Sequence, residues 1–171
     1  ADKWDLCMVA HPPCTRLCLS GARWLKVAPP GRTIEEMRKE LKIGCRLIAD
    51  IWNADVPRIA IENPIMLGEA REEIQKISDR EFPYSPTQYV QPYEFAKNID
   101  APDNVTKKTS LWLKNLPPLV KTGTLTEATA RKDIHFASPG PDRWKIRSKF
   151  HVGLADAMAK QWGEVLLGEK I

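Results

Sequence analysis

The sequence lacks the features that would place a protein in a membrane or outside the cell. Its 171 residues contain no apolar stretch that approaches the length of a membrane span. The N-terminal residues 1–5 lack the basic region and apolar run of a signal peptide. Only four cysteines are present, without the framework of a small secreted protein: Cys7, Cys14, Cys18 and Cys45. We therefore expect a soluble protein with free thiols in a reducing cytoplasm.

A strong excess of one charge is also missing. Lys and Arg number 26 against 22 Asp and Glu, a net charge of +4, which permits a polyanionic partner without demanding one. The chain is 43% hydrophobic and 28% charged, which excludes a disordered tail, a coiled coil and a collagen-like polymer. Because a domain of about 150 residues buries roughly 70% of its unfolded surface, we expect a single domain over residues 1–171.

Two short apolar runs predict buried strands that end in polar or proline-rich loops. Trp4–Ala10 ends at a Pro-Pro pair, and Arg58–Ile61 ends at Glu62-Asn63-Pro64. Between them, Thr33 and Glu36 form the pattern of a capping box. Apolar residues follow at helical spacing over about five turns: Ile34, Met37, Leu41, Cys45, Ile48 and Trp52. A crossover helix makes the strands parallel, so both loops should leave the carboxyl edge, where open α/β sheets bind ligands.

The remainder of the chain is less regular. Residues 65–82 suggest a polar, helix-rich connection, and short extended pieces are expected at 88–91 and at Ser110–Leu113. Residues 121–147 are polar and predict an exposed excursion. His151–Leu167 predicts an amphipathic helix. Together these patterns predict a three-layer α/β domain with a mostly parallel sheet and flanking helices.

Cys14 and Glu62 are the residues best suited to chemistry. Cys14 follows Pro12-Pro13 on a stiff loop, and Glu62-Asn63 ends the neighbouring strand, so both should face one crevice. A sulfur nucleophile beside a carboxylic acid suits covalent addition to an electron-poor ring. The thiolate attacks one ring carbon, the acid protonates a ring nitrogen, and the opposite carbon becomes nucleophilic. Methylation of carbon 5 of a pyrimidine requires this chemistry.

Several ordered blocks resemble cytosine-5 DNA methyltransferases. Pro12–Gly21 resembles the motif that carries their nucleophile, and Glu62-Asn63-Pro64 resembles their Glu-Asn-Val, whose glutamate contacts the ring nitrogen. Longer runs resemble small phage-encoded DNA cytosine methyltransferases still more: His11–Thr15 with Ser20–Leu25, Ile61–Pro64, Lys108–Pro117 and Gly153–Gly163. The resemblance covers most of the chain and implies a methyltransferase-like, Rossmann-like fold in a bacterial or phage-infected cell.

The resemblance also implies a reaction and its residues. The expected activity is methyl transfer from S-adenosylmethionine to carbon 5 of cytosine in DNA, with the target base flipped out of the stack. Cys14 would be the nucleophile, Glu62 the acid, and Asn63 would hold the Glu62 loop. His11 would lower the thiol pKa if it is protonated. Residues expected to contact the substrate are Pro12, Pro13, Lys108 and Arg147.

The chain departs from this family at several points. The strand and glycine-rich turn that hold S-adenosylmethionine do not precede Cys14, so the N-terminal part of the fold is expected to be missing or lost. We therefore expect the chain alone to bind this cofactor weakly or not at all. Cys18 stands where a serine is expected, and Lys107-Lys108 replace a basic Gln-x-Arg-x-Arg motif. The target-recognition segment is confined to residues 121–147.

Alternative interpretations remain for the same residues. Glu62 could cap the turn before Pro64, and Cys18 and Cys45 could be small core residues. A metal site at Cys7, His11, Cys14 and Cys18 lacks a second Cys/His pair for tetrahedral closure, so none is expected.

Two further alternatives concern partners and function. Arg143, Arg147 and Lys149 with Trp144 could hold a phosphate and stack a base, or form a plain exposed loop. The whole chain could be a non-catalytic nucleic-acid or protein-binding remnant of the fold. It could also be an amino-methyltransferase, although those enzymes carry an aromatic residue after the prolines.

Overall fold

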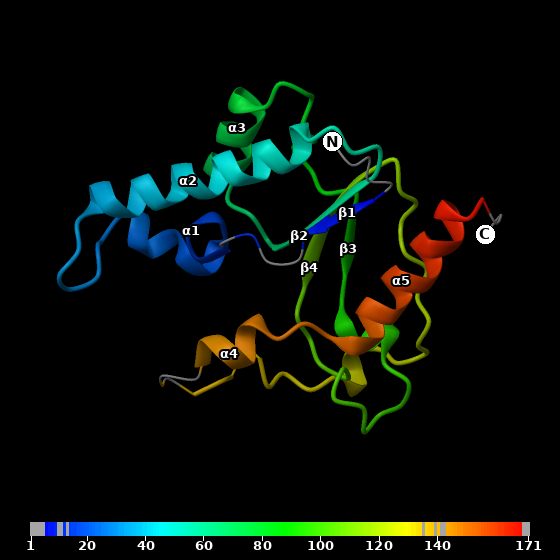
Figure 1. Cartoon of the computed structure of the whole chain (residues 1–171). Coiled ribbons are helices and arrows are strands. Elements are labelled where there is room, and N and C mark those ends of the chain that lie inside the picture. Colours follow the sequence, from blue (N-terminus) through cyan, green and yellow to red (C-terminus); the bar gives the residue numbers. More distant parts are fainter. Residues whose placement is uncertain are drawn as a thin grey trace. The chain divides into compact units, whose positions relative to one another are not determined.

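The computed structural model describes residues 6–9, 12, 14–134, 136–138, 140 and 143–168 (Figure 1). The chain divides into two compact units. The first comprises residues 1–88 and 109–115, and the second comprises residues 89–108 and 116–171. Cys14, Glu62 and Asn63 belong to the first unit, whereas Lys108 and Arg147 belong to the second.

A small sheet forms the centre of the first unit. β1 (Cys7–Val9) pairs in parallel with β2 (Ile59–Pro64), with Cys7 opposite Ile59. β4 (Thr109–Lys114) pairs with the other edge of β2 in the antiparallel direction, from Ile59 opposite Lys114 to Pro64 opposite Thr109. The parallel pair confirms the direction expected from a crossover helix between the first two strands.

The prediction of a mostly parallel, Rossmann-like sheet is wrong. The longest pairing in the first unit is the antiparallel one between β2 and β4, so the sheet is small and mixed within an α/β chain. Hydrophobic runs show that a strand is buried, but they carry no information about its direction. Direction depends on the path of the connection, and residues 65–108 return the chain so that β4 opposes β2.

β2 also extends beyond its expected end. Glu62, Asn63 and Pro64 are its last residues, opposite Leu111, Ser110 and Thr109 of β4. Glu62 therefore lies inside a strand and not in a turn. The polar character of these residues suggested a loop, but their backbone instead pairs with that of β4 in the antiparallel ladder.

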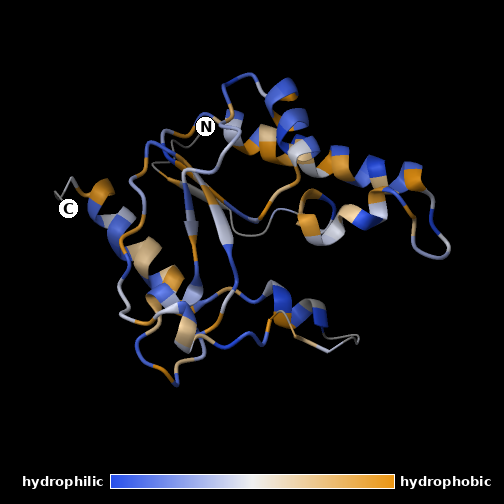
Figure 2. Cartoon of the chain, turned by 180° about the vertical axis from the view of Figure 1, so that it is seen from behind, coloured by the Kyte–Doolittle hydropathy of each residue, from blue (hydrophilic) through white to orange (hydrophobic). Residues whose placement is uncertain are grey.

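The predicted long helix is present as α2 (Ile34–Asn53). The Thr33 hydroxyl accepts a hydrogen bond from the Glu36 backbone N–H at 3.1 Å, and the Glu36 carboxylate accepts from the Thr33 N–H at 2.8 Å. This confirms the capping box. Figure 2 shows hydrophilic and hydrophobic residues alternating along α2. Its buried face carries Met37, Leu41, Cys45, Ile48 and Trp52, whereas Ile34, expected on that face, is exposed.

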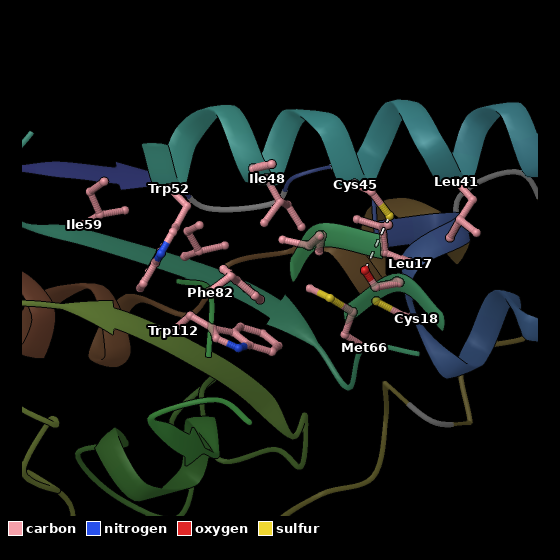
Figure 3. Packing of buried hydrophobic residues seen from close by; sticks show 14 of the residues in the cluster. Leu17, Cys18, Leu41, Cys45, Ile48, Trp52, Ile59, Met66, Phe82 and Trp112 are labelled. Carbon is pink, nitrogen blue, oxygen red and sulfur yellow. Dashed lines mark hydrogen bonds between the residues drawn. The ribbon is translucent and has the colours of Figure 1, made fainter. Parts of the chain in front are cut away.

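Aromatic side chains fill the space beneath α2 in the first unit (Figure 3). Phe82 meets Trp52 edge-to-face at 5.2 Å between ring centroids and stacks on Trp112 at 5.8 Å. Both indole N–H groups are satisfied, because Trp52 donates to the Glu81 carbonyl and Trp112 to the Pro83 carbonyl. α3 (Gly68–Ile77) adds Ala70 and Ile74 to this core. Burial of each large side chain stabilises the unit by about 2 kcal/mol.

The second unit contains mostly short elements. It holds β3 (Gln88–Val90), which begins on the last residue of the first unit, the 3-10 helices η2 (Pro92–Phe95) and η3 (Glu127–Thr129), and α4 (Arg143–Ser148). α5 (Val152–Leu166) confirms the predicted amphipathic helix, since it buries Leu154, Ala157, Met158 and Trp162.

The N-terminus of α5 is held by one carboxylate. Asp103 accepts the Gly153 backbone N–H at 2.7 Å and lies 3.1 Å from Nδ1 of His151. Burial lowers the pKa of His151, against the opposing effect of Asp103. His151 is therefore neutral at pH 7. Within the described ranges, no helix combines the length and the apolar character needed to cross a membrane.

Candidate active site

Cys14 is the first residue of a short helix that follows β1. This helix, α1 (Cys14–Leu17), leads into the 3-10 helix η1 (Leu19–Leu25). Cys14 is half-buried and packs against the hydrophobic core of the first unit. Pro12 is buried. Pro13, His11 and the side chain of Cys7 lie outside the described residues, so the expectations for them stay predictions.

Backbone hydrogen bonds join the segment after β1 to the segment after β2. The Leu19 N–H donates to the Ile65 carbonyl at 3.1 Å, and the Leu67 N–H donates to the Leu17 carbonyl at 2.7 Å. Between these two bonds, Cys18 forms a bridge with Met66, and Figure 3 shows these two side chains next to one another. The two parallel strands therefore send their following segments to the same edge of the sheet.

Cys18 connects Cys14 to the end of β2. Its thiol donates to Oδ1 of Asn63 at 2.8 Å, and its sulfur lies 3.7 Å from the Pro64 carbonyl oxygen. The side chains of Cys14 and Cys18 are also hydrogen-bonded to each other. Cys18 is 2% exposed and Asn63 is fully buried. A continuous chain of side-chain contacts thus runs from Cys14 through Cys18 to Asn63.

Cys18 holds its proton tightly. The hydrogen bond with Cys14, burial, and the charges of Cys14 and Glu62 raise the pKa of Cys18 far above the usual range of a thiol. Cys18 is therefore a neutral thiol that donates a hydrogen bond, and it is poorly suited to be a nucleophile. Cys45 is inert for a related reason: burial, with the charges of Glu73 and Glu69, raises its pKa to about 12.

The side chains of Glu62 and Asn63 project from opposite faces of the sheet at the end of β2. Consecutive residues of a strand point to opposite faces of the sheet. Asn63 shares its face with Ile61, which is part of the core, so the Glu62 carboxyl group projects from the other face. Glu62 is 4% exposed, and its charge acts on Cys18. The structure thus gathers Cys14, Cys18, Glu62 and Asn63 at one end of the sheet.

Ser110 is a polar residue of this region that sequence reasoning missed. It lies directly opposite Asn63 on β4 and is 1% exposed. Among the described residues, neither the Ser110 hydroxyl nor Nδ2 of Asn63 has a hydrogen-bond partner. Unsatisfied buried polar groups are rare in folded proteins, so each calls for a partner or a role. No local signal could identify Ser110, because its neighbourhood depends on the antiparallel pairing with β2.

The basic residues singled out from the sequence lie in the second unit. The Lys108 ammonium group lies 4.4 Å from the centre of the Tyr89 ring, a cation–π contact. Lys107 donates to the Lys149 carbonyl at 3.0 Å. Arg147 and Lys149 are exposed, and Arg147 lies on α4. The side chain of Trp144 lies outside the described residues, so its proposed stacking on a base stays a prediction.

A cofactor site is not evident in the described residues. Backbone amides at a glycine turn after a strand commonly approach a nucleotide-like cofactor. None of the nine glycines directly follows β1, β2, β3 or β4. The described residues therefore do not fit S-adenosylmethionine, and we assign none of them to it. In the same part of the chain, no group of three or more His, Cys, Asp and Glu side chains is placed to hold a metal ion.

A hollow on the first unit lies apart from these residues. It is lined by side chains of α2 and α3 that are mostly charged, among them Glu35, Arg38, Lys42, Glu69 and Glu73. It contains neither a nucleophile nor any member of the cysteine cluster. In comparisons with known proteins, no family model, curated protein or solved structure matches this chain.

Proposed function

We propose that this chain methylates carbon 5 of cytosine in DNA, with Cys14 as the nucleophile and Glu62 as the acid. The observation that supports this proposal is the cluster at the ends of β1 and β2. There, a half-buried thiol at a helix start is linked through Cys18 to Asn63, and the buried carboxyl group of Glu62 acts on Cys18. The family resemblance of the sequence supplies the reaction class and the methyl donor, S-adenosylmethionine.

The residues of the cluster suit each step on the base. The Cys14 thiolate forms a bond to carbon 6 while the Glu62 carboxyl group donates a proton to ring nitrogen 3, so carbon 5 becomes nucleophilic. S-adenosylmethionine, to which none of the described residues is assigned, would supply the methyl group to carbon 5 when bound. A base then removes the original proton from carbon 5, the bond between sulfur and carbon 6 breaks, and nitrogen 3 returns its proton to Glu62.

DNA is the proposed partner because the reaction needs a cytosine that has left the base stack. The segment from Arg143 to Lys149 supports contact with the phosphate backbone. It carries four cations and no acidic residue, with Lys145, Arg147 and Lys149 exposed. Asn63, whose amide oxygen accepts the Cys18 thiol, is proposed to keep the end of β2 in place.

A mechanism-based trap tests the proposal. DNA that contains 5-fluorocytosine should form a covalent adduct with the chain when S-adenosylmethionine is present and the chain is supplied with any missing cofactor-binding part, because fluorine cannot leave carbon 5 as a proton does. Mass spectrometry of peptides should place the adduct on Cys14. An adduct on Cys18 would contradict the assignment of the nucleophile. No adduct from a folded protein that binds both DNA and S-adenosylmethionine would favour the non-catalytic alternative.

DNA binding should be weak and steeply dependent on salt. Each neutralised phosphate contributes about 0.9 to the slope of log affinity against log salt concentration. Replacing Arg143, Arg147 and Lys149 with glutamate should therefore lower that slope by about 2.7 and remove most binding, as measured by fluorescence anisotropy over a salt series.

A matched control makes the same change of charge elsewhere. Lys39, Lys42 and Lys76 are exposed on α2 and α3 of the first unit. Glutamate at these three positions should leave the salt slope close to that of the unmodified chain. Equal losses in both triple variants would show that net charge, and not the segment around α4, determines binding.

A further inference from the structure

Cys18 has a single proton and two hydrogen-bonding neighbours. Its thiol points to Oδ1 of Asn63 at 2.8 Å, and its side chain is also hydrogen-bonded to that of Cys14. The backbone supports this arrangement, since the Cys18 N–H donates to the Cys14 carbonyl at 3.1 Å. The two thiols are thus held one helical turn apart, with Cys18 on the buried side.

The two thiols differ in their access to water. Cys14 is half-buried, whereas Cys18 is 2% exposed. Cys14 is therefore the thiol of the pair that can release its proton to water, whereas burial and the nearby negative charges raise the pKa of Cys18. When Cys14 loses its proton to solvent, the Cys18 thiol lies beside a thiolate, which is a stronger acceptor than an amide oxygen.

We propose that Cys18 is a positioning residue for Cys14: its S–H turns from Asn63 to the Cys14 sulfur when Cys14 ionises, and it thereby stabilises the thiolate. The inference deepens the proposed function, on which it rests, by naming a residue that prepares the nucleophile. No proton passes between the two cysteines. Cys14 releases its proton to water, and Cys18 keeps its own and changes only its acceptor.

Ser110 can complete the exchange of hydrogen bonds. When Cys18 turns away, Oδ1 of Asn63 needs another donor. The Ser110 hydroxyl stands directly opposite Asn63 in the antiparallel pair, at a distance that side chains of such pairs can bridge. Among the described residues it has no partner, and a hydroxyl hydrogen rotates freely to suit its acceptor. Oδ1 of Asn63 therefore has a donor in both states.

Among the described residues, ionisable groups on α1, α2 and β2 lie near the pair. Glu62 of β2 acts on Cys18 and disfavours its ionisation. Arg16 of α1 is bound at 2.8 Å to Glu40 of α2, which leaves its charge largely balanced. Cys45 of α2 stays neutral in the same core because its pKa is raised to about 12. Substitution of Cys18 leaves these groups in place. A change in the pH dependence of Cys14 alkylation therefore reports the loss of the Cys18 donor.

The test measures the reactivity of Cys14 without DNA or a methyl donor. The intact chain is alkylated with iodoacetamide between pH 5 and pH 10, and fragment-ion mass spectrometry quantifies the product at Cys14. We expect Cys18→Ala to raise the midpoint of this pH profile by about one unit, since a donor to the thiolate is lost. Below both midpoints, the fraction of Cys14 present as thiolate falls about tenfold when the midpoint rises by one unit. Alkylation should slow only about threefold, because a more basic thiolate is intrinsically more reactive.

Matched variants separate positioning from folding. Cys18→Ser keeps a donor and should retain the original midpoint. Cys18→Val fills the space without a donor and should raise the midpoint as Cys18→Ala does, so it takes the place of Cys18→Ala if the alanine variant folds poorly. Cys45→Ala removes another buried thiol from the same core and should leave the midpoint unchanged. An unchanged midpoint in both folded variants without a donor, or an equal rise in Cys18→Ser, would overturn the proposal. Neither result depends on whether the chain methylates DNA.

Discussion

Exchange of the hydrogen at carbon 5 of cytosine should stop when Cys14 is replaced by serine. Addition of the thiolate to carbon 6, with protonation of nitrogen 3, makes carbon 5 basic enough to take a proton from water. Reversal of these steps then releases the original hydrogen, with no need for a methyl donor. DNA labelled with tritium at carbon 5 of cytosine should release tritium to water, and Cys14→Ser should slow this release at least about a thousandfold.

Three further variants sharpen the interpretation of that result. Glu62→Gln removes the proton donor and should slow exchange by about a hundredfold. Cys45→Ser makes the same chemical change as Cys14→Ser at a buried residue whose thiol donates to the Ala70 carbonyl, and it should leave exchange intact. Cys18→Ala should slow exchange far less than Cys14→Ser, because a nucleophile remains.

DNA affinity provides the second control on Cys14. The nucleophile contributes to the reaction and little to binding, so Cys14→Ser should bind DNA as the unmodified chain does. Exchange that continues at the original rate in Cys14→Ser would defeat the assignment. Exchange absent from the unmodified, DNA-binding chain would favour a binding remnant over an enzyme.

Replacing Gly21 with alanine should lower the free energy of unfolding by about 2–4 kcal/mol. A Cβ atom at this position would lie 1.8 Å from the Thr15 carbonyl oxygen and 2.9 Å from its carbonyl carbon. Both atoms belong to the backbone of α1, so no side-chain rotation can relieve the clash. α1 and η1 would have to separate, against the hydrogen bond from the Gly21 N–H to the Cys18 carbonyl at 2.9 Å.

Denaturant unfolding followed by circular dichroism measures this effect. Gly163→Ala is the matched control, because no atom lies within 4 Å of the added Cβ in α5. That variant should be more stable by about 0.5–1 kcal/mol, since alanine favours a helix interior over glycine. If Gly21→Ala unfolded within about 0.5 kcal/mol of the unmodified chain, the close packing of η1 on α1 would be contradicted.

Local sequence patterns predicted the two long helices, α2 and α5, well. The capping box at Thr33 and Glu36 placed the start of α2, because the two hydrogen bonds that it needs join residues three positions apart. Spacing of apolar residues placed most of its buried face. Ile34 differs because it lies in the first turn, where α2 is exposed on the side that the pattern assigned to the core. The amphipathic pattern of α5 was equally local.

The candidate site required both kinds of information. The Pro-Pro-Cys and Glu-Asn sequences identified Cys14, Glu62 and Asn63 as the residues to examine, and a crossover helix placed β1 and β2 in parallel. The link between them was not visible, because Cys18 and Asn63 are distant in sequence and meet only when the two strand ends are joined. The only sequence signal for Cys18 was its place four residues after Cys14.

The sequence by itself thus predicted the long helices α2 and α5, the approximate positions of buried strands, and Cys14 and Glu62 as the residues to examine. These features depend on contacts between residues a few positions apart, or on the chirality of a single crossover. Only the tertiary structure decided the antiparallel direction of β4, the extension of β2 through Pro64, and the pairing of Asn63 with Ser110. All three depend on where residues 65–108 return the chain, and the hydrogen bonds that a strand offers to its neighbours fit either direction.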